Sequence, residues 1–186
     1  MKRIMIIVGA VAVVALGAWL LTGRRPAATT GGEFTNGAGN MRIESAAFEQ
    51  GGEIPSKYTC DGPDISPPLT IIGAPADTKS LALLVDDPDS VGGNWVHWLV
   101  WNIDPTFTQI AEGTAPRKGI EGITSFGRSG WGGPCPPSGT HRYFFKVYAL
   151  DISLDLKPSA DGAEFEKAIV GHILDKAGLL GNYQRK

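Results

Sequence analysis

Three short apolar runs stand out along the chain. Residues 81–85 form a continuous apolar run, and residues 95–103 are apolar apart from His97 and Asn102; both are typical of strands buried on both faces. Residues 141–150 predict a third strong strand. A weaker strand is expected over residues 42–48. Loops rich in Gly, Pro and Asp fill residues 51–68 and most of 113–139, so the strands are expected to be joined by long connections.

A different pattern comes after the last run. Residues 163–177 carry Phe165, Ile169, Ile173 and Leu174 at helical spacing, which predicts a helix with one apolar face. Asp161 stands where the N-cap of such a helix is expected. Strands separated by long loops and followed by one late helix predict a mainly β, antiparallel fold with a C-terminal helix.

The N-terminal region differs from the rest. An apolar run from Ile4 to Leu21 follows Lys2 and Arg3, and as a helix it would span about 27 Å, close to the roughly 30 Å core of a bilayer. Residues 1–25 are therefore predicted to be a transmembrane anchor, with a cleaved signal sequence as the alternative. Residues 26–40 are expected to be a flexible linker, and residues 41–186 the domain, on the extracytoplasmic side.

Composition narrows the range of functions. A hydrophobic content of 42% is enough for a core, and 25 Gly with 13 Pro suit a loop-rich β fold. The formal charge is -2, and the sequence has no basic run beyond pairs. Binding to nucleic acid through a phosphate-tracking patch is therefore not expected.

The polar residues of interest lie at the ends of the apolar runs. Residues two apart in a strand share a face, so two imidazoles, a phenol, an indole and two carboxylates could line one hollow if these strand ends meet. The candidates are Asp87, Asp89, Trp95, His97, His141 and Tyr143.

Each candidate alone has an ordinary explanation, such as a core histidine or an Asp-Pro-Asp turn. Together they are more specific, because buried polar groups need partners. The carboxylates can accept hydrogen bonds from the imidazoles, and the remaining ring N–H groups can then donate to an anion. A protonated ring has the most N–H groups to offer. Binding is then expected to weaken as the pH rises through the imidazole range. His172 lies on the expected helix and is expected to cap or pack.

The order of short motifs resembles the phosphatidylethanolamine-binding protein family, in its bacterial Raf-kinase-inhibitor-like branch, over residues 41–186. The resemblance implies two antiparallel sheets with short helices and one small anion pocket lined by the six candidates. It also implies a pocket rim over 133–137, with Gly133, Pro136 and Pro137. Thr124-Ser125 and Trp131 depart from the family pattern near that rim. The segments that carry the resemblance are residues 58–62, 66–69, 86–89, 96–103, 133–137, 141–145 and 171–174.

The resemblance also places both cysteines in loops near the pocket. Outside the cytoplasm, Cys60 and Cys135 could form a disulfide. Two separate thiols are the alternative.

The expected function is binding rather than catalysis, with no cofactor. A zwitterion such as phosphoethanolamine suits imidazoles on one side and carboxylates on the other. The pocket could also modulate an unidentified partner protein. The alternative is a hydrolase or a metal-dependent enzyme that uses the same His and Asp residues.

Overall fold

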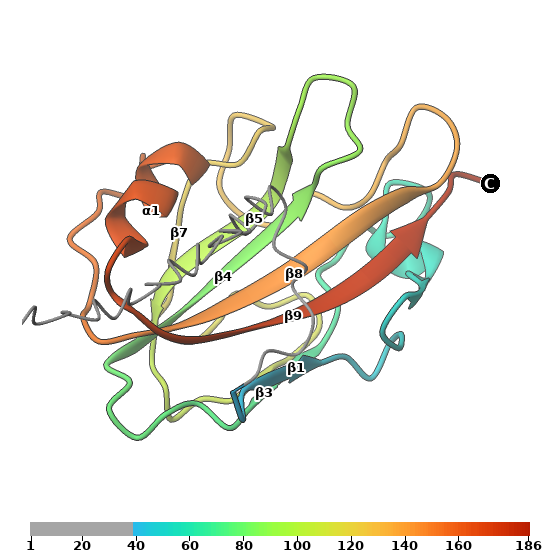
Figure 1. Ribbon diagram of the computed structural model, residues 1–186. Coiled ribbons are helices and arrows are strands. Elements are labelled where there is room, and N and C mark those ends of the chain that lie inside the picture. Colours follow the sequence, from blue (N-terminus) through green and yellow to red (C-terminus); the bar gives the residue numbers. More distant parts are fainter. Residues whose placement is uncertain (1–38) are drawn as a thin grey trace, which may run out of the picture. The chain divides into compact units, whose positions relative to one another are not determined.

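The computed structural model of the chain describes residues 39–186 (Figure 1). The anchor predicted over residues 1–25, and the linker as far as residue 38, lie outside this part of the chain. Within residues 39–186, no helix has the length and apolar character needed to cross a bilayer.

Two sheets make up the described domain (Figure 1). In the six-stranded sheet every neighbouring pair is antiparallel except β2 with β9, which is parallel. The mainly β fold with two sheets is confirmed, and the parallel edge pair is a departure from the expectation. The large sheet has the order β2 (Gly52–Glu53), β9 (Ile173–Tyr183), β8 (His141–Leu150), β4 (Ser80–Asp87), β5 (Trp95–Ile103), β7 (Ile120–Glu121). The small antiparallel sheet has the order β1 (Arg42–Glu44), β3 (Leu69–Ile72), β6 (Gln109–Ile110).

Strand β4 is buried along its whole length, as its unbroken apolar run predicts. Leu83 and Val85 pack into a core shared with the small sheet, while Ala82 and Leu84 pack into a second core on the opposite face. The second core lies under α1 and includes Phe165. A strand with apolar contacts on both faces is held firmly in place, so the residues at its end are well positioned.

The late helix is shorter than predicted. Helix α1 (Gly162–Ile169) is capped by Asp161, whose side chain accepts from the backbone N–H of Glu164 and closes a capping box, so the predicted N-cap is confirmed. It ends because Val170 is extended and Gly171 has a φ of 82°, a conformation that glycine adopts readily. The helix predicted over 163–177 was therefore wrong beyond residue 169. A second short helix, η1 (Ser56–Tyr58), is of the 3-10 type.

The segment after α1 is strand β9, which pairs with β8 from His141↔Tyr183 to Leu150↔Ile173. Ile173 and Leu174 are each 41% exposed and do not form a helical apolar face. His172 lies in the turn before β9, where its Nδ1 is 2.9 Å from Asp151 Oδ1.

A register shift near the start of β5 matters for the site. Val85 pairs with Trp98 and Asp86 pairs with Val96, so His97 is an extra residue on its strand. A β-bulge of this kind re-aims a side chain. The carbonyl of His97 has its partner in the rim loop, since it accepts from the N–H of Gly132 at 3.0 Å.

Candidate functional site

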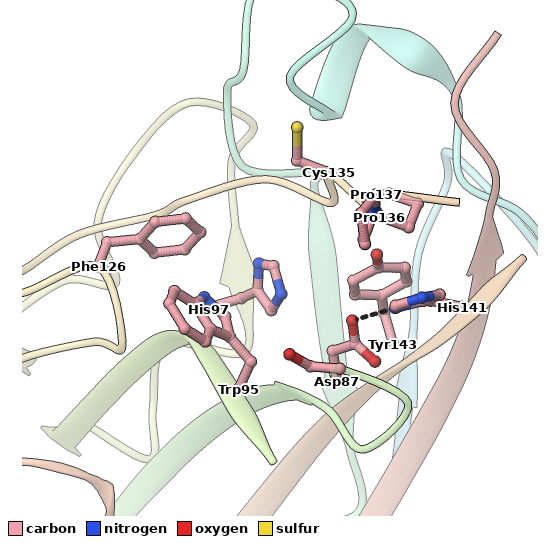
Figure 2. A pocket seen from close by; sticks show the side chains of 10 residues that line it. Asp87, Trp95, His97, Phe126, Cys135, Pro136, Pro137, His141 and Tyr143 are labelled. Carbon is pink, nitrogen blue, oxygen red and sulfur yellow. Dashed lines mark hydrogen bonds and ion pairs between the residues drawn. The ribbon is translucent and has the colours of Figure 1, made fainter. Parts of the chain in front are cut away.

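Three strand ends meet at one edge of the large sheet. Strand β4 ends there, and β5 and β8 begin there, because the three are antiparallel neighbours. Together with two loops they line a half-open hollow of about 210 Å³ (Figure 2). It is lined by Asp87, Ser90, Trp95, His97, Phe126, Cys135, Pro136, Pro137, His141 and Tyr143.

Asp87 and His141 form a buried pair on one side of the hollow. His141 Nδ1 is 2.7 Å from Asp87 Oδ2, and the two side chains are 10% and 5% exposed. The other carboxylate oxygen of Asp87 accepts from the backbone N–H of Asp89 at 2.8 Å. An ionised carboxylate only accepts hydrogen bonds, so His141 donates from Nδ1 and its Nε2 is left for other partners.

His97 lies on the opposite side and is fixed by the rim loop. Its Nδ1 is 2.6 Å from the carbonyl oxygen of Gly132. A carbonyl has no proton to give, so Nδ1 carries the hydrogen. Burial lowers the pKa of the His97 imidazole below its usual value, and the Gly132 carbonyl and the charge of Asp87 offset only part of this. The expectation that a protonated ring holds the anion is therefore not supported for His97.

Tyr143 fills the floor between the two histidines. Its ring lies 5.2 Å from the His97 ring, edge to face, and the residue is 1% exposed. Burial raises the pKa of the phenol, and the charge of Asp87 raises it further, so the hydroxyl keeps its proton. Within residues 39–186 the buried hydroxyl makes no hydrogen bond of good geometry, but the Asp87 carboxylate lies close enough to act on it as an acceptor, so the hydroxyl can donate either to Asp87 or to a ligand.

Two aromatic rings form the outer wall. Trp95 and Phe126 lie 5.4 Å apart, and Phe126 lies 5.5 Å from His97, both in edge-on geometry. The loop that brings Phe126 is held by Ser125, whose Oγ accepts from the N–H of Val96 at 2.9 Å. Ser125, one of the departures from the family pattern, therefore positions the wall without lining it.

The rim is tied to a neighbouring loop. Cys60 and Cys135 form a disulfide with their Cα atoms 5.4 Å apart, in agreement with the pairing considered from the sequence. The N–H of Cys60 also donates to the carbonyl of Pro134 at 3.1 Å. Pro136 and Pro137 close one side of the hollow (Figure 2).

Two of the predicted site residues do not line the hollow. Asp89 faces Arg142, which donates to it from the guanidinium at 2.7 and 2.9 Å and from the backbone at 3.0 Å. These bonds hold the pKa of Asp89 below its usual value. Gly133 instead donates its N–H to Asp64 Oδ1 at 2.7 Å, and a Cβ there would lie 2.6 Å from the Tyr58 carbonyl oxygen.

Seven of the nine predicted residues do lie around the hollow, and three further residues join them. Ser90 comes directly after the Asp-Pro-Asp turn, and Phe126 and Cys135 come from loops. The only sequence signal for Phe126 is that it is a large apolar residue in a predicted loop; the structure leaves it 41% exposed. Across residues 39–186, no group of three or more His, Cys, Asp or Glu side chains is placed to hold a metal ion.

Comparison with known proteins gives a consistent result. The sequence profile of the phosphatidylethanolamine-binding protein family matches residues 44–184. A UPF0098 protein of Methanothermobacter thermautotrophicus is 47% identical over 150 residues, which are 78% of this chain and 99% of that protein. A UPF0098 protein of Chlamydia muridarum is 42% identical over 150 residues, with the same coverage of both chains.

Solved structures agree with the sequence matches. A putative phosphatidylethanolamine-binding protein homologue from Chlamydia trachomatis superposes with a TM-score of 0.76 at 39% identity. YbcL of E. coli, described as a member of the mammalian PEBP family, superposes with a TM-score of 0.74 at 31% identity. Each superposition covers 79% of this chain and 99% of the other. The chain therefore belongs to the phosphatidylethanolamine-binding protein family.

Proposed function

We propose that this chain binds small phosphate-bearing ligands, anionic or zwitterionic, in the hollow between β4, β5 and β8. One observation carries the proposal: a small, half-open hollow brings together two histidines, a carboxylate and a protonated phenol within aromatic walls. Convergent polar groups in a concave site are what a small ligand needs for orientation. Membership of the family supports ligand binding in general terms.

The polar groups suit the two ends of a zwitterion. The hydroxyl of Tyr143 can donate to an oxygen of a phosphate, and so can Nε2 of His141 when that ring is protonated. The carboxylate of Asp87 and the faces of Trp95 and Phe126 are suited to an ammonium group. Phosphoethanolamine carries both ends and is small enough to enter a hollow of about 210 Å³.

Titration calorimetry with phosphoethanolamine tests the proposal. Replacing His97 or His141 with alanine should weaken binding roughly 10- to 150-fold, which corresponds to about 1.5–3 kcal/mol for a hydrogen bond to a charged group. His172→Ala is the matched control, because His172 pairs with Asp151 and does not line the hollow. Equal affinity of the unmodified chain and both pocket variants would mean that these histidines are core residues.

We also propose that residues 1–25 anchor the domain to a membrane on its extracytoplasmic side. The support is the apolar run from Ile4 to Leu21, which is long enough to span a bilayer core. The chain without residues 1–25 should be soluble, while the full chain should sediment with membranes. Uncleaved full chain in a detergent-free soluble extract would overturn this proposal.

A further inference from the structure

His97 presents a lone pair to the hollow. Its Nδ1 donates to the Gly132 carbonyl at 2.6 Å, and a neutral imidazole with hydrogen on one nitrogen accepts at the other. Figure 2 shows the ring turned so that its second nitrogen is directed towards Tyr143 and His141. The free atom, Nε2, is therefore a hydrogen-bond acceptor wherever the ring is neutral.

The surroundings of His97 keep the ring neutral. The ring is almost fully buried, at 4% exposure, and burial disfavours its charged form. The groups that face it are the Asp87 carboxylate from β4, Tyr143 and His141 from β8, and the Gly132 carbonyl from the rim loop. The more distant charges of Asp64 and Asp86 also act on it. These carboxylates do not overcome the effect of burial.

The hollow is short of fixed positive charge for an anion-binding site. Among its lining residues there is no Lys or Arg, and nearby Arg142 is occupied by Asp89. Asp87 and His97 Nε2 can only accept, whereas the Tyr143 and Ser90 hydroxyls and the Trp95 indole carry donors. Nε2 of His141 accepts when that ring is neutral and donates when it is protonated. A ligand oxygen that lies against His97 Nε2 must therefore carry a hydrogen.

We propose that the hollow selects phosphate monoesters in their monoanionic form, because the ligand itself must supply the proton that His97 accepts. In this arrangement the P–O–H group donates to His97 Nε2, and the remaining oxygens accept from Tyr143 and His141. A phosphodiester or a sulfate has no such hydrogen. The inference rests on the proposed binding of phosphate-bearing ligands and defines their class: soluble monoesters, not the diester head groups of intact phospholipids.

A charge-matched pair of probes tests this directly. At pH 6 the full chain is titrated with methyl phosphate, dimethyl phosphate, inorganic phosphate and sulfate. Methyl phosphate monoanion and dimethyl phosphate carry the same charge and differ in the acidic hydrogen. We expect methyl phosphate to bind roughly 10- to 150-fold more tightly than dimethyl phosphate, the range for one hydrogen bond to a charged group. Inorganic phosphate should exceed sulfate by a similar factor.

The pH dependence separates the proton of the ligand from the protons of the protein. A phosphate monoester loses its second proton at about pH 6, so the affinity for methyl phosphate should fall above that pH. Methylphosphonate keeps its second proton to higher pH, and its affinity should fall at a correspondingly higher pH. If both ligands lost affinity at the same pH, the titrating proton would belong to the protein and not to the ligand, and the proposal would be overturned.

The variant His97→Gln gives a third readout, with His172→Gln as the control. A glutamine amide can turn its NH2 group towards an unprotonated oxygen, so the preference for methyl phosphate over dimethyl phosphate should shrink in His97→Gln and persist in the control. Tight and equal binding of all four probes by the unmodified chain would overturn the selectivity and leave phosphate binding intact. Binding of none of the four probes would overturn both proposals.

Discussion

The disulfide at the rim allows a quantitative prediction. Cys60 and Cys135 are 75 residues apart, and closing a loop of that length restricts the unfolded chain. In the chain-entropy model the effect is about 4 kcal/mol at 25 °C. Replacing both cysteines with serine should lower the free energy of unfolding by up to this amount.

The folded rim should survive the substitution, because other bonds hold it. Gly132 donates to the His97 carbonyl at 3.0 Å, and Gly133 donates to Asp64 at 2.7 Å. The loss of stability should therefore come mainly from a less restricted unfolded state. For a chain of this size, about 4 kcal/mol corresponds to a fall in Tm of about 8–16 °C.

Thermal unfolding, followed by circular dichroism with and without dithiothreitol, provides the assay. Reductant should bring the unmodified chain to the Tm of the double serine variant and should leave that variant unchanged. A Tm that is the same in both chains and in both conditions would refute the reasoning, because it would mean that the disulfide does not form or does not restrict the unfolded chain.

Further predictions concern individual residues. Because burial lowers the pKa of His97, the unfolded chain binds more protons at that group, and stability should fall as the pH drops below about 6.5. Urea unfolding at pH 7.5 and 5.5 should show this fall reduced in His97→Gln. Gly133→Ala should destabilise the domain strongly, because its Cβ would lie 2.6 Å from the Tyr58 carbonyl oxygen; a midpoint in urea unchanged from the unmodified chain would contradict that. Asp161→Ala should cost about 1 kcal/mol in the same assay, through loss of the α1 cap.

Much of the large sheet could be predicted from the sequence. The segments over 81–85, 95–103 and 141–150 correspond to β4, β5 and β8. The continuous apolar run of β4 reflects burial on both faces, whereas β8 alternates between buried and more exposed residues over its first half. The prediction failed after Ile169. Ile173 continues the helical spacing in the sequence, but Gly171 adopts a positive φ that ends the helix. Residues 173–183 instead form strand β9, because they pair with β8.

The site residues, too, could be predicted from the sequence only in part. The sharing of a face by Trp95 and His97, and by His141 and Tyr143, could be expected from strand periodicity. Carboxylate–imidazole pairing was expected in general terms, but only the structure shows that His141 is the partner of Asp87. Asp89 was misplaced because the period of two no longer holds once β4 has turned. Phe126 was missed because its position depends on a loop that docks at the start of β5, and no local pattern specifies that contact.

The acceptor role of His97 was also beyond the sequence. It depends on the bulge that removes His97 from the β4 ladder and on the Gly132 carbonyl that takes its Nδ1 hydrogen. Both features arise from contacts between residues far apart in the chain. The sequence supported a histidine in a hollow, and only the geometry assigned which nitrogen faces a ligand.

The central claim is that a phosphate-bearing ligand binds between His97 and His141. The chain has only three histidines, so the imidazole resonances of His97, His141 and His172 can be monitored together by NMR while phosphoethanolamine is added. The account predicts saturable shifts for His97 and His141 and none for His172, which lies outside the hollow. Unchanged resonances for His97 and His141 at saturating ligand would contradict it.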